Sequence, residues 1–424
     1  MKIIYITAGA AGMFCGSCMH DNALARALTD LGHDVQLIPL YTPVRLDEPA
    51  AVSERLFFGG INVYLQQNIP LFRKLPAWFD RVFDQPWLLK WASQKSVKIR
   101  AQELGELTVS MLRGVAGNQR KEVDRLVAWI VAEQPDAVIF TNALVAGAAP
   151  EIRRRWNCKL VVTFQGDDIF LNELAEPFQT QARAEMQRLG ESVDVLLTNS
   201  NYYADHMAGL LRLPRDKFRI VPLGLDTRDF TAESPPAEDR PPTVGYLARL
   251  APEKGLHQLA DAFLRLRSQP GCEHARLRIA GWLGGHHREY AEQVLANLHA
   301  AAPGAVAHVG EVDRRGKLEF LRSIDVLSVP TTYRDPKGLY VLEALAAGVP
   351  VVQPNHGAFP EVLQDTGGGV LVAPDDPTEL AAALADMLRN PERRRQLARE
   401  GRAAVPARRN ARAMAEQTLA AIQS

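Results

Sequence analysis

The stretch GLYVLEALAAGVPVV, residues 338–352, predicts a helix that leads directly into a buried strand. Its first part is small and apolar, and its end, VPVV, is β-branched and apolar. Such a strand is typical of a parallel sheet that helices cover on both faces. Glu343 does not fit this pattern, because a carboxylate among apolar residues needs a specific partner.

Short apolar runs alternate with helical patterns along the rest of the chain. In the first half, strands are predicted at IIYIT, DVQLIPL, AVIFTN, KLVVTF and VLLTNS, and in the second half at TVGYLA, ARLRIAG, VAHVG, VLSVP, PVVQP and GGVLVA. This alternation predicts an α/β protein with two Rossmann-like, doubly wound parallel-sheet domains. If the two domains face one another, the carboxyl ends of their strands line a cleft where ligands bind.

Changes in composition predict where the domains begin and end. Residues 1–230 form the N-terminal domain, 231–242 a linker rich in proline and charge, and 243–405 the C-terminal domain. Residues 406–424 form a helix that caps either domain, and in one alternative it crosses back to the N-terminal domain. An aromatic-rich insertion at about 60–119 holds three of the six tryptophans. It either packs on the N-terminal domain or contacts an acceptor or a membrane surface.

The overall composition excludes several classes of function. The chain has 424 residues, of which 47% are hydrophobic and 23% charged, as in a folded globular protein. Lys plus Arg and Asp plus Glu are both 49, so no net field favours nucleic acid as a partner. The four cysteines make no disulfide framework, and the sequence shows neither a signal peptide nor a membrane-spanning run. We therefore expect a cytoplasmic protein, with peripheral contact at the inner membrane face as an alternative.

Two cations follow the first predicted strand of the second half, in GYLARLAPEKGLHQL. Arg249 stands at the strand end, and Lys254 precedes Gly255, where a helix begins. Basic side chains beside the free N–H groups of a helix N-terminus form a good receptor for a diphosphate. The alternative is a solvated loop with surface Arg and Lys.

Two carboxylates eight residues apart lie in TTYRDPKGLYVLEALAAG. Asp335 precedes the predicted helix, and Glu343 lies within it. Gly338 permits a ligand to approach the backbone, so the N–H groups of Gly338, Leu339 and Tyr340 are expected to point at phosphate oxygens. Glu343 would then accept hydrogen bonds from vicinal hydroxyls, as a ribose offers. The alternative is two ordinary helix charges.

Two glycine-containing turns are further candidates for ligand binding. Gly357 follows the strand PVVQP, while Gly16 and Ser17 precede a helix in the first βα loop. The same loop carries Cys15 and Cys18, whose CxxC spacing suits either a redox pair or two small thiols. A zinc site would need two further ligands nearby, so we expect no metal.

In combination, these motifs resemble family 4 of the retaining nucleotide-sugar glycosyltransferases, which have the GT-B fold of two facing Rossmann-like domains. The resemblance rests on CGSCMHDNALARALTDLGHDV near the start, on NSNYYADHM and IVPLGLDTRDF, on GYLARLAPEKG, and on the spacing from Asp335 to Glu343 followed by LEALAAGVPVV. It covers nearly the whole chain. The segment GINVYLQQNIPLF is also faintly similar to bacterial glycogen and starch synthases.

The resemblance implies a role for each candidate residue. Arg249 and Lys254 would bind the donor diphosphate, with the backbone amides of residues 338–340 cradling phosphate. Glu343 would hold the donor ribose, and Asp335 would lie close to the transferred sugar. The first-domain loop would approach the donor through Gly16 and Ser17.

Two positions depart from the family pattern. Gln165, in VVTFQGDDIF, stands where the family commonly has His, and its amide binds hydroxyls without changing protonation near neutral pH. Asp335 stands where the family usually has Glu, and its carboxylate reaches one methylene less far. Asp167 and Asp168 either bind sugar or serve as ordinary loop residues. We expect the catalytic residues to be Asp335, Gln165, Arg249 and Lys254.

These expectations define a function. The chain is expected to be a hexosyltransferase that moves a sugar from a nucleotide-sugar donor to a hydroxyl acceptor on a glycan, glycolipid or small molecule, with retention. Preorganised cations at the diphosphate would stabilise the transition state more than the ground state, and no metal or other cofactor is expected. The alternatives are a non-catalytic nucleotide-sugar-binding relative and a glucan synthase-like enzyme.

Overall fold

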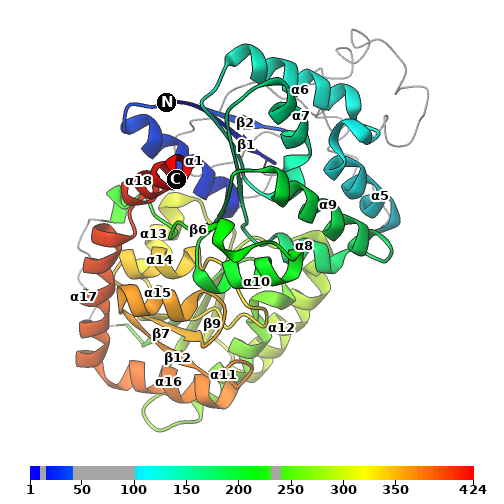
Figure 1. The fold of residues 1–424 in the computed structure, drawn as a ribbon. Helices are drawn as coiled ribbons and strands as arrows, with labels where there is room; N and C mark the ends of the chain where they lie inside the picture. Colours follow the sequence, from blue (N-terminus) through cyan, green and yellow to red (C-terminus); the bar gives the residue numbers. More distant parts are fainter. Residues whose placement is uncertain (10–15, 42–100, 231–239) are drawn as a thin grey trace. The chain divides into compact units, whose positions relative to one another are not determined.

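The computed structural model describes residues 1–9, 16–41, 101–230 and 240–424. The chain divides into two compact units: unit 1 is Met1–Pro222 with Met414–Ser424, and unit 2 is Leu223–Ala413. Each unit has its own six-stranded parallel sheet and its own hydrophobic core (Figure 1). The prediction of two doubly wound α/β domains is confirmed. Most of the predicted linker and most of the aromatic-rich insertion lie outside the described residues.

The sheet of unit 1 has the strand order β2-β1-β3-β4-β5-β6. Five strands coincide with predicted apolar runs, and the sixth, β6, was not predicted from the sequence. Its three residues carry an exposed arginine at their centre, so they form a strand only as the edge partner of β5. The strands are β1 (Lys2–Thr7), β2 (Asp34–Pro39), β3 (Ala137–Phe140), β4 (Lys159–Thr163), β5 (Val195–Thr198) and β6 (Phe218–Ile220).

Helices cover the sheet of unit 1 because its strands are apolar on both faces. They include α5, the described end of the predicted insertion, which contacts α9 and buries Val109 and Leu112 in the core. The helices are α1 (Gly16–Asp30), α5 (Ala101–Leu112), α6 (Arg120–Glu133), α7 (Ala149–Arg155), α8 (Asp167–Glu173), α9 (Phe178–Ser192) and α10 (Asn201–Leu211).

The sheet of unit 2 has the order β12-β11-β10-β7-β8-β9, and all six strands lie in predicted apolar runs. After β9 the chain returns to the centre of the sheet, and right-handed crossovers then place the helices after β10 and β11 on the opposite face, whereas the helix after β12 returns to the first face. Accordingly, α11 (Leu256–Arg267) contacts α12 (Arg288–Ala301) and α16 (Pro377–Arg389). On the other face, α14 (Leu339–Ala346) and α15 (Phe359–Thr366) contact α17 (Pro391–Arg408). The strands are β7 (Thr243–Leu247), β8 (Arg276–Ala280), β9 (Val306–Gly310), β10 (Val326–Leu327), β11 (Val351–Pro354) and β12 (Gly369–Val372).

The helices of unit 2 include the one predicted from the opening stretch, which is α14. Near the C-terminus the helix boundaries differ from a start at residue 406, because α17 continues through Pro406 to Arg408. The next helix is α18 (Ala411–Gln423), most of which belongs to unit 1. Val405, in the last turn of α17, is buried in the hydrophobic core of unit 2. The helices of unit 2 are α11 (Leu256–Arg267), α12 (Arg288–Ala301), α13 (Arg314–Arg322), α14 (Leu339–Ala346), α15 (Phe359–Thr366), α16 (Pro377–Arg389) and α17 (Pro391–Arg408).

Candidate active site

In unit 2 the residues predicted to bind the donor follow the two central strands of the sheet. β7 and β10 are hydrogen-bonded neighbours, and the strand order runs in opposite directions on either side of them. Arg249 and Lys254 follow β7, and the segment from Asp335 to Glu343 follows β10. In open α/β sheets, ligands bind at the carboxyl ends of the strands where the order reverses. The fold therefore brings both predicted motifs to the position where such sheets bind ligands.

Lys254 is held by the loop that follows β10. Its Nζ donates to Asp335 Oδ2 at 2.8 Å and to the Tyr333 hydroxyl at 2.6 Å. The ammonium also lies 4.8 Å from the centroid of the Tyr333 ring and 5.4 Å from that of Tyr340, which adds two cation–π contacts. The Lys254 side chain is 12% exposed, so these contacts act with little screening by water.

Asp335 is surrounded by hydrogen-bond donors. Its Oδ1 accepts from the N–H groups of Lys337 at 3.0 Å and Gly338 at 3.2 Å. Its Oδ2 accepts from Lys254 and, at 3.1 Å, from the Tyr340 hydroxyl, and the residue is 3% exposed. Burial alone would raise the pKa of Asp335, but the charge and hydrogen bond of Lys254 hold it well below its ordinary value of 3.8. The carboxylate therefore stays ionised beside Lys254.

One amide of the predicted cradle at the start of α14 already has a partner within the protein. Gly338 has the left-handed conformation that the prediction required, with φ at 69°. Its N–H, however, donates to Asp335 instead of pointing at a ligand. Aspartate is short enough to bond backbone N–H groups two and three residues further on, which explains the difference. The amides of Leu339 and Tyr340 then begin the helix, and no side-chain cap bonds to this end of α14.

Arg249 is more exposed than Lys254. Its guanidinium pairs with Glu253 at 2.9 Å, and its side chain is 40% exposed. The backbone of Arg249 is held by a hydrogen bond, because the hydroxyl of the buried Tyr246 donates to the Arg249 carbonyl at 3.0 Å. Arg249 thus combines a rigid backbone with a side chain that can turn toward an anion.

Two glycines allow the loops of the site to meet. Gly255 has φ at 71°, and a Cβ there would lie 1.7 Å from the carbonyl oxygen of Pro330. Gly357, in the turn after β11, has φ at 60°, and a Cβ there would lie 2.5 Å from the carbonyl oxygen of Asp335. That carbonyl also accepts from the Ala358 N–H at 2.9 Å. The loops after β7, β10 and β11 therefore support one another through backbone contacts.

Glu343 has a partner that the sequence did not indicate. Its Oε1 accepts from Lys317 Nζ at 2.7 Å, and both side chains are nearly buried. Lys317 lies on α13, which also carries several arginines and a glutamate. In the sequence Lys317 resembles these charged residues, and nothing marks it as the buried one. Among the described residues, nothing donates to Oε2 of Glu343. The ion pair fixes the direction of the carboxylate and leaves one oxygen for a further donor.

In unit 1, Gln165 follows β4 and is 7% exposed. Its Nε2 lies 3.1 Å from Asp21 Oδ1, 3.0 Å from the carbonyl of Thr141 and 3.1 Å from Thr141 Oγ1. Asp21 lies on α1, which begins with the predicted Gly16 and Ser17. The sequence analysis did not single out Asp21, because one aspartate on an amphipathic helix resembles a surface residue.

The two aspartates after Gln165 have structural partners. Asp167 accepts from the backbone N–H groups of Ala143 at 2.8 Å and Gln165 at 2.9 Å, and burial raises its pKa to about 6. Asp168 accepts from the Tyr203 hydroxyl at 2.6 Å and lies 3.1 Å from Nε2 of His206. Burial would raise the pKa of Asp168, but its hydrogen bonds, first that from His206, lower it. Both carboxylates therefore fix the loop that carries Gln165.

Other candidate features contribute less to this site. Cys15 lies outside the described residues, and the Cys18 side chain is buried. In the described part of the chain, no three His, Cys, Asp or Glu side chains gather where they could hold a metal. Within the same ranges, no helix is both long and apolar enough to cross a membrane.

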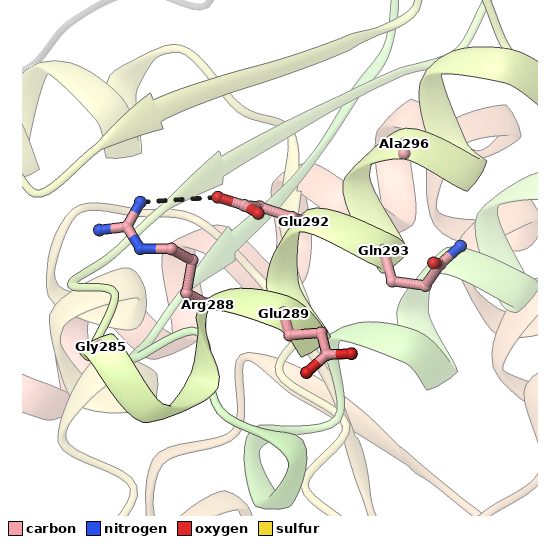
Figure 2. A pocket seen from close by; sticks show the side chains of 6 residues that line it. All are labelled: Gly285, Arg288, Glu289, Glu292, Gln293 and Ala296. Carbon is pink, nitrogen blue, oxygen red and sulfur yellow. Dashed lines mark ion pairs between the residues drawn. The ribbon is translucent and has the colours of Figure 1, made fainter.

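A separate groove of unit 2 runs along α12, with a volume of about 560 Å³. Figure 2 shows that an ion pair between Arg288 and Glu292 borders it, at 3.5 Å. None of the predicted donor-binding residues lines the groove. Its lining residues are Gly285, Arg288, Glu289, Glu292, Gln293 and Ala296.

Comparisons with known proteins agree with this architecture. Residues 21–224 match the family model "Glycosyl transferase 4-like domain", and residues 227–404 match "Glycosyl transferases group 1". The chain is 28% identical over 296 residues to a glycogen synthase of Mycobacterium tuberculosis, covering 68% of this chain and 67% of that protein. It is 26% identical over 363 residues to a GDP-mannose-dependent monoacylated alpha-(1-6)-phosphatidylinositol monomannoside mannosyltransferase of Corynebacterium glutamicum, covering 82% and 86%.

Solved structures share the fold at low sequence identity. A sucrose-phosphate synthase of Thermosynechococcus elongatus has a TM-score of 0.70 and 18% identity, covering 100% of this chain and 98% of that one. Anabaena HepE, in complex with UDP and glucose, has a TM-score of 0.68 and 16% identity, covering 100% of both chains. The two family models together account for nearly all of the chain, and the neighbours share its two-domain fold. The chain therefore belongs to the GT-B glycosyltransferases, with an N-terminal half of the 4-like family and a C-terminal half of group 1.

Proposed function

We propose that the chain transfers a sugar from a nucleotide-sugar donor to a hydroxyl acceptor, with retention of the anomeric configuration. The observation that carries this proposal is the position of Lys254, which is held by Asp335 and Tyr333 at the strands where the order of the sheet reverses. An ammonium has three hydrogens, and these two bonds use two of them. The third is available for an oxygen of the donor diphosphate.

The nucleotide portion of the donor is assigned to the same unit. Arg249 would meet the second phosphate, and the Leu339 and Tyr340 amides, at the positive end of α14, would add two donors. Glu343, held by Lys317 through one oxygen, would accept a ribose hydroxyl with the other. The nucleotide-sugar class is supported by the corynebacterial relative, whose name specifies GDP-mannose, and by HepE, whose complex holds UDP and glucose.

The mechanism follows from where charge develops. The bond from the anomeric carbon to the diphosphate oxygen breaks, and that oxygen gains negative charge while the sugar becomes oxocarbenium-like. The acceptor oxygen then bonds to the anomeric carbon on the same face and loses its proton to the departing phosphate. Lys254, Arg249 and the α14 amides stabilise the leaving group, so the proposal needs no metal.

The contacts of Asp335 support a different role from direct contact with the sugar. A carboxylate that accepts from Lys254, Tyr340 and two backbone amides has little capacity left for a sugar hydroxyl. We therefore assign Asp335 to holding Lys254 in place. The same observation favours the second candidate, a non-catalytic nucleotide-sugar binder, because a sugar-contacting carboxylate would then be lacking at this position.

Turnover of a donor panel separates the two candidates. The chain is incubated with UDP-glucose, GDP-mannose and ADP-glucose, with and without mixtures of glycan and glycolipid acceptors, and release of nucleoside diphosphate is measured. We expect slow release from at least one donor and at least a roughly 10²-fold loss of rate in Lys254→Ala. Calorimetry should show weaker nucleoside diphosphate binding in Lys254→Ala and Arg249→Ala.

Arg288→Ala is the matched control, because it removes an exposed cation of the same unit from the α12 groove. That variant should keep both the affinity and the rate. Binding without release under every acceptor mixture would establish the non-catalytic binder. The anomeric configuration of the product, read by NMR, tests retention, and a long homopolymeric product would indicate the glucan synthase-like alternative.

A further inference from the structure

The orientation of the Gln165 amide is fixed by its neighbours. Two of the oxygens near Nε2, Asp21 Oδ1 and the Thr141 carbonyl, only accept hydrogen bonds, so the side-chain atom that faces them must be the NH₂ group. Thr141 Oγ1 donates its own hydrogen to Asp21 Oδ2 at 2.5 Å, so it too can only accept from Nε2. Three acceptors thus share the two hydrogens of Nε2. Nε2 therefore has no hydrogen left for a substrate, and any hydrogen bond from a substrate to this amide must end on its carbonyl oxygen, which can accept two.

Asp21 is the centre of this network. It is 0% exposed, and its oxygens accept from the hydroxyls of Tyr5 at 2.6 Å, Thr7 at 2.8 Å and Thr141. Nδ1 of His20 lies 3.1 Å from Oδ1. Burial would raise the pKa of Asp21, but the hydrogen bond and charge of His20, followed by the hydroxyls, lower it. A buried, ionised carboxylate with this many donors is a rigid anchor for the Gln165 amide.

The network lies where unit 1 is expected to meet a ligand. Thr7 ends β1, Thr141 follows β3 and Gln165 follows β4, and the strand order of the sheet reverses between β1 and β3. The carboxyl ends of strands at such a reversal are the ligand-binding edge of an open α/β sheet. Asp21 therefore supports the side chain that reaches this edge.

We propose that Asp21 is a positioning residue that locks Gln165 so that its carbonyl oxygen accepts a hydrogen bond from a hydroxyl of a carbohydrate substrate. This inference rests on the proposed sugar transfer. To that proposal it adds the role of Asp21 and the direction of one hydrogen bond: the substrate hydroxyl donates and Gln165 accepts. A histidine or a freely rotating amide at position 165 could do either, whereas the amide held by Asp21 cannot.

The test reverses the polarity of the pair. In Gln165→Glu, the introduced carboxylate faces Asp21 at hydrogen-bond distance and repels it near pH 8. At lower pH a proton between the two carboxyls replaces the amide hydrogen, and the second oxygen at position 165 still accepts from the substrate. We expect kcat/KM relative to wild type to be down about 10²-fold at pH 8 and to recover at least about tenfold by pH 5.5. The assay uses whichever donor of the panel the wild-type chain turns over.

A second substitution should restore the pair. Asp21→Asn alone leaves one acceptor oxygen where the carboxylate had two and removes the charge that orients the surrounding donors, so the Gln165 amide is held less firmly and we expect about a tenfold loss of kcat. Combined with Gln165→Glu, the introduced amide at position 21 donates to the carboxylate at position 165. The double variant should return to within about tenfold of wild type, with no pH dependence relative to it.

Other titratable groups near Asp21 and Gln165 could also make the rate depend on pH, and their effect has to be separated from that of the pair. Tyr5 on β1, Cys18 and His20 on α1, and Asp167 on α8 surround the pair, and all four are also present in the wild-type chain. Dividing each variant rate by the wild-type rate at the same pH removes their contribution. If Asp21→Asn fails to fold, Gln165→Met serves instead, because it keeps the volume, removes the acceptor oxygen and should lower kcat at every pH equally.

Thermal unfolding and calorimetric UDP or GDP affinity establish that each variant is folded, since the nucleotide site is assigned to unit 2. A Gln165→Glu variant that matches wild type at every pH, or a folded double variant no better than its parents, would overturn the inference alone. A wild-type chain that turns over no donor would overturn the proposed transfer, and the inference with it. Recovery in the double variant supports both.

Discussion

Buried carboxylates determine how the site is held, and each has a partner distant in sequence. Glu343 pairs with Lys317, Asp335 with Lys254, and Asp21 with hydroxyls from two strands. Removing one member of such a pair leaves an uncompensated buried charge, which commonly costs about 3–5 kcal/mol. Substitutions at these positions therefore need a stability measurement beside every activity measurement.

Asp167 is predicted to make unit 1 more stable at mildly acidic pH. Its pKa is raised by burial from 3.8 to about 6, so between these values the folded chain holds a proton that the unfolded chain has lost. The free energy of unfolding should therefore fall as pH rises from about 4 to about 6 and stay flat above that. The shift corresponds to about 3 kcal/mol. Asp167→Asn should lose this dependence in urea titrations across the range.

Asp168 provides the control for that measurement, because its pKa is lowered. The stabilisation that Asp168 contributes is present above about pH 4 and is lost as pH falls through its lower folded pKa. The free energies of unfolding of the wild-type chain and of Asp168→Asn should therefore converge as the pH falls. For Asp167 the dependence has the opposite sign, because the stabilisation from its raised pKa is lost as the pH rises. Equal pH dependence of wild type and Asp167→Asn would contradict the raised pKa.

At the scale of elements, the loops after β7 and β10 support one another through direct contacts. Gly255→Ala is predicted to disturb both, because its Cβ would lie 1.7 Å from the carbonyl oxygen of Pro330 and Lys254 is the preceding residue. We expect a loss of about 3 kcal/mol in stability and at least a roughly tenfold weaker affinity for nucleoside diphosphate. Thermal unfolding and calorimetry measure the two effects.

Gly304 gives a matched comparison in the same unit. It has φ at 72°, close to the 71° of Gly255, but a Cβ there would meet nothing within 4 Å. Gly304→Ala should therefore cost only the left-handed backbone strain, about 1–2 kcal/mol, and leave nucleotide affinity unchanged. Equal effects of the two substitutions would show that the contact with Pro330 does not matter.

At the scale of the whole molecule, two separate hydrophobic cores predict two unfolding transitions. One core is confined to unit 1 and the other to unit 2. A nucleoside diphosphate at about 100 times its dissociation constant should stabilise one transition by about 2.7 kcal/mol and leave the other in place. Differential scanning calorimetry with UDP or GDP measures this.

Two variants assign the transitions in that experiment. Gly304→Ala should lower the transition of unit 2, and Lys254→Ala should abolish its shift with nucleotide. A single cooperative transition, or equal shifts of both, would contradict independent cores and a site within unit 2.

The sequence by itself determined the class of fold and the positions of the donor-binding loops. Apolar runs and helical spacing are local properties, so eleven strands and the two domains could be predicted, whereas β6, with an arginine at its centre, could not. Arg249 and Lys254 were recognisable because a strand end and a helix start flank them in sequence.

Only the tertiary structure decided which side chains hold one another. Lys254 and Asp335 are 81 residues apart and Gln165 and Asp21 are 144 apart, and no local pattern encodes such pairings. Lys317 and Asp21 resemble surface residues in the sequence and become buried partners only when their helices pack. The hydrogen bond from the Gly338 amide to Asp335 is likewise visible only in the folded chain. Burial makes a charged group require a partner, and the order of strands in the sheet determines which partner is within reach.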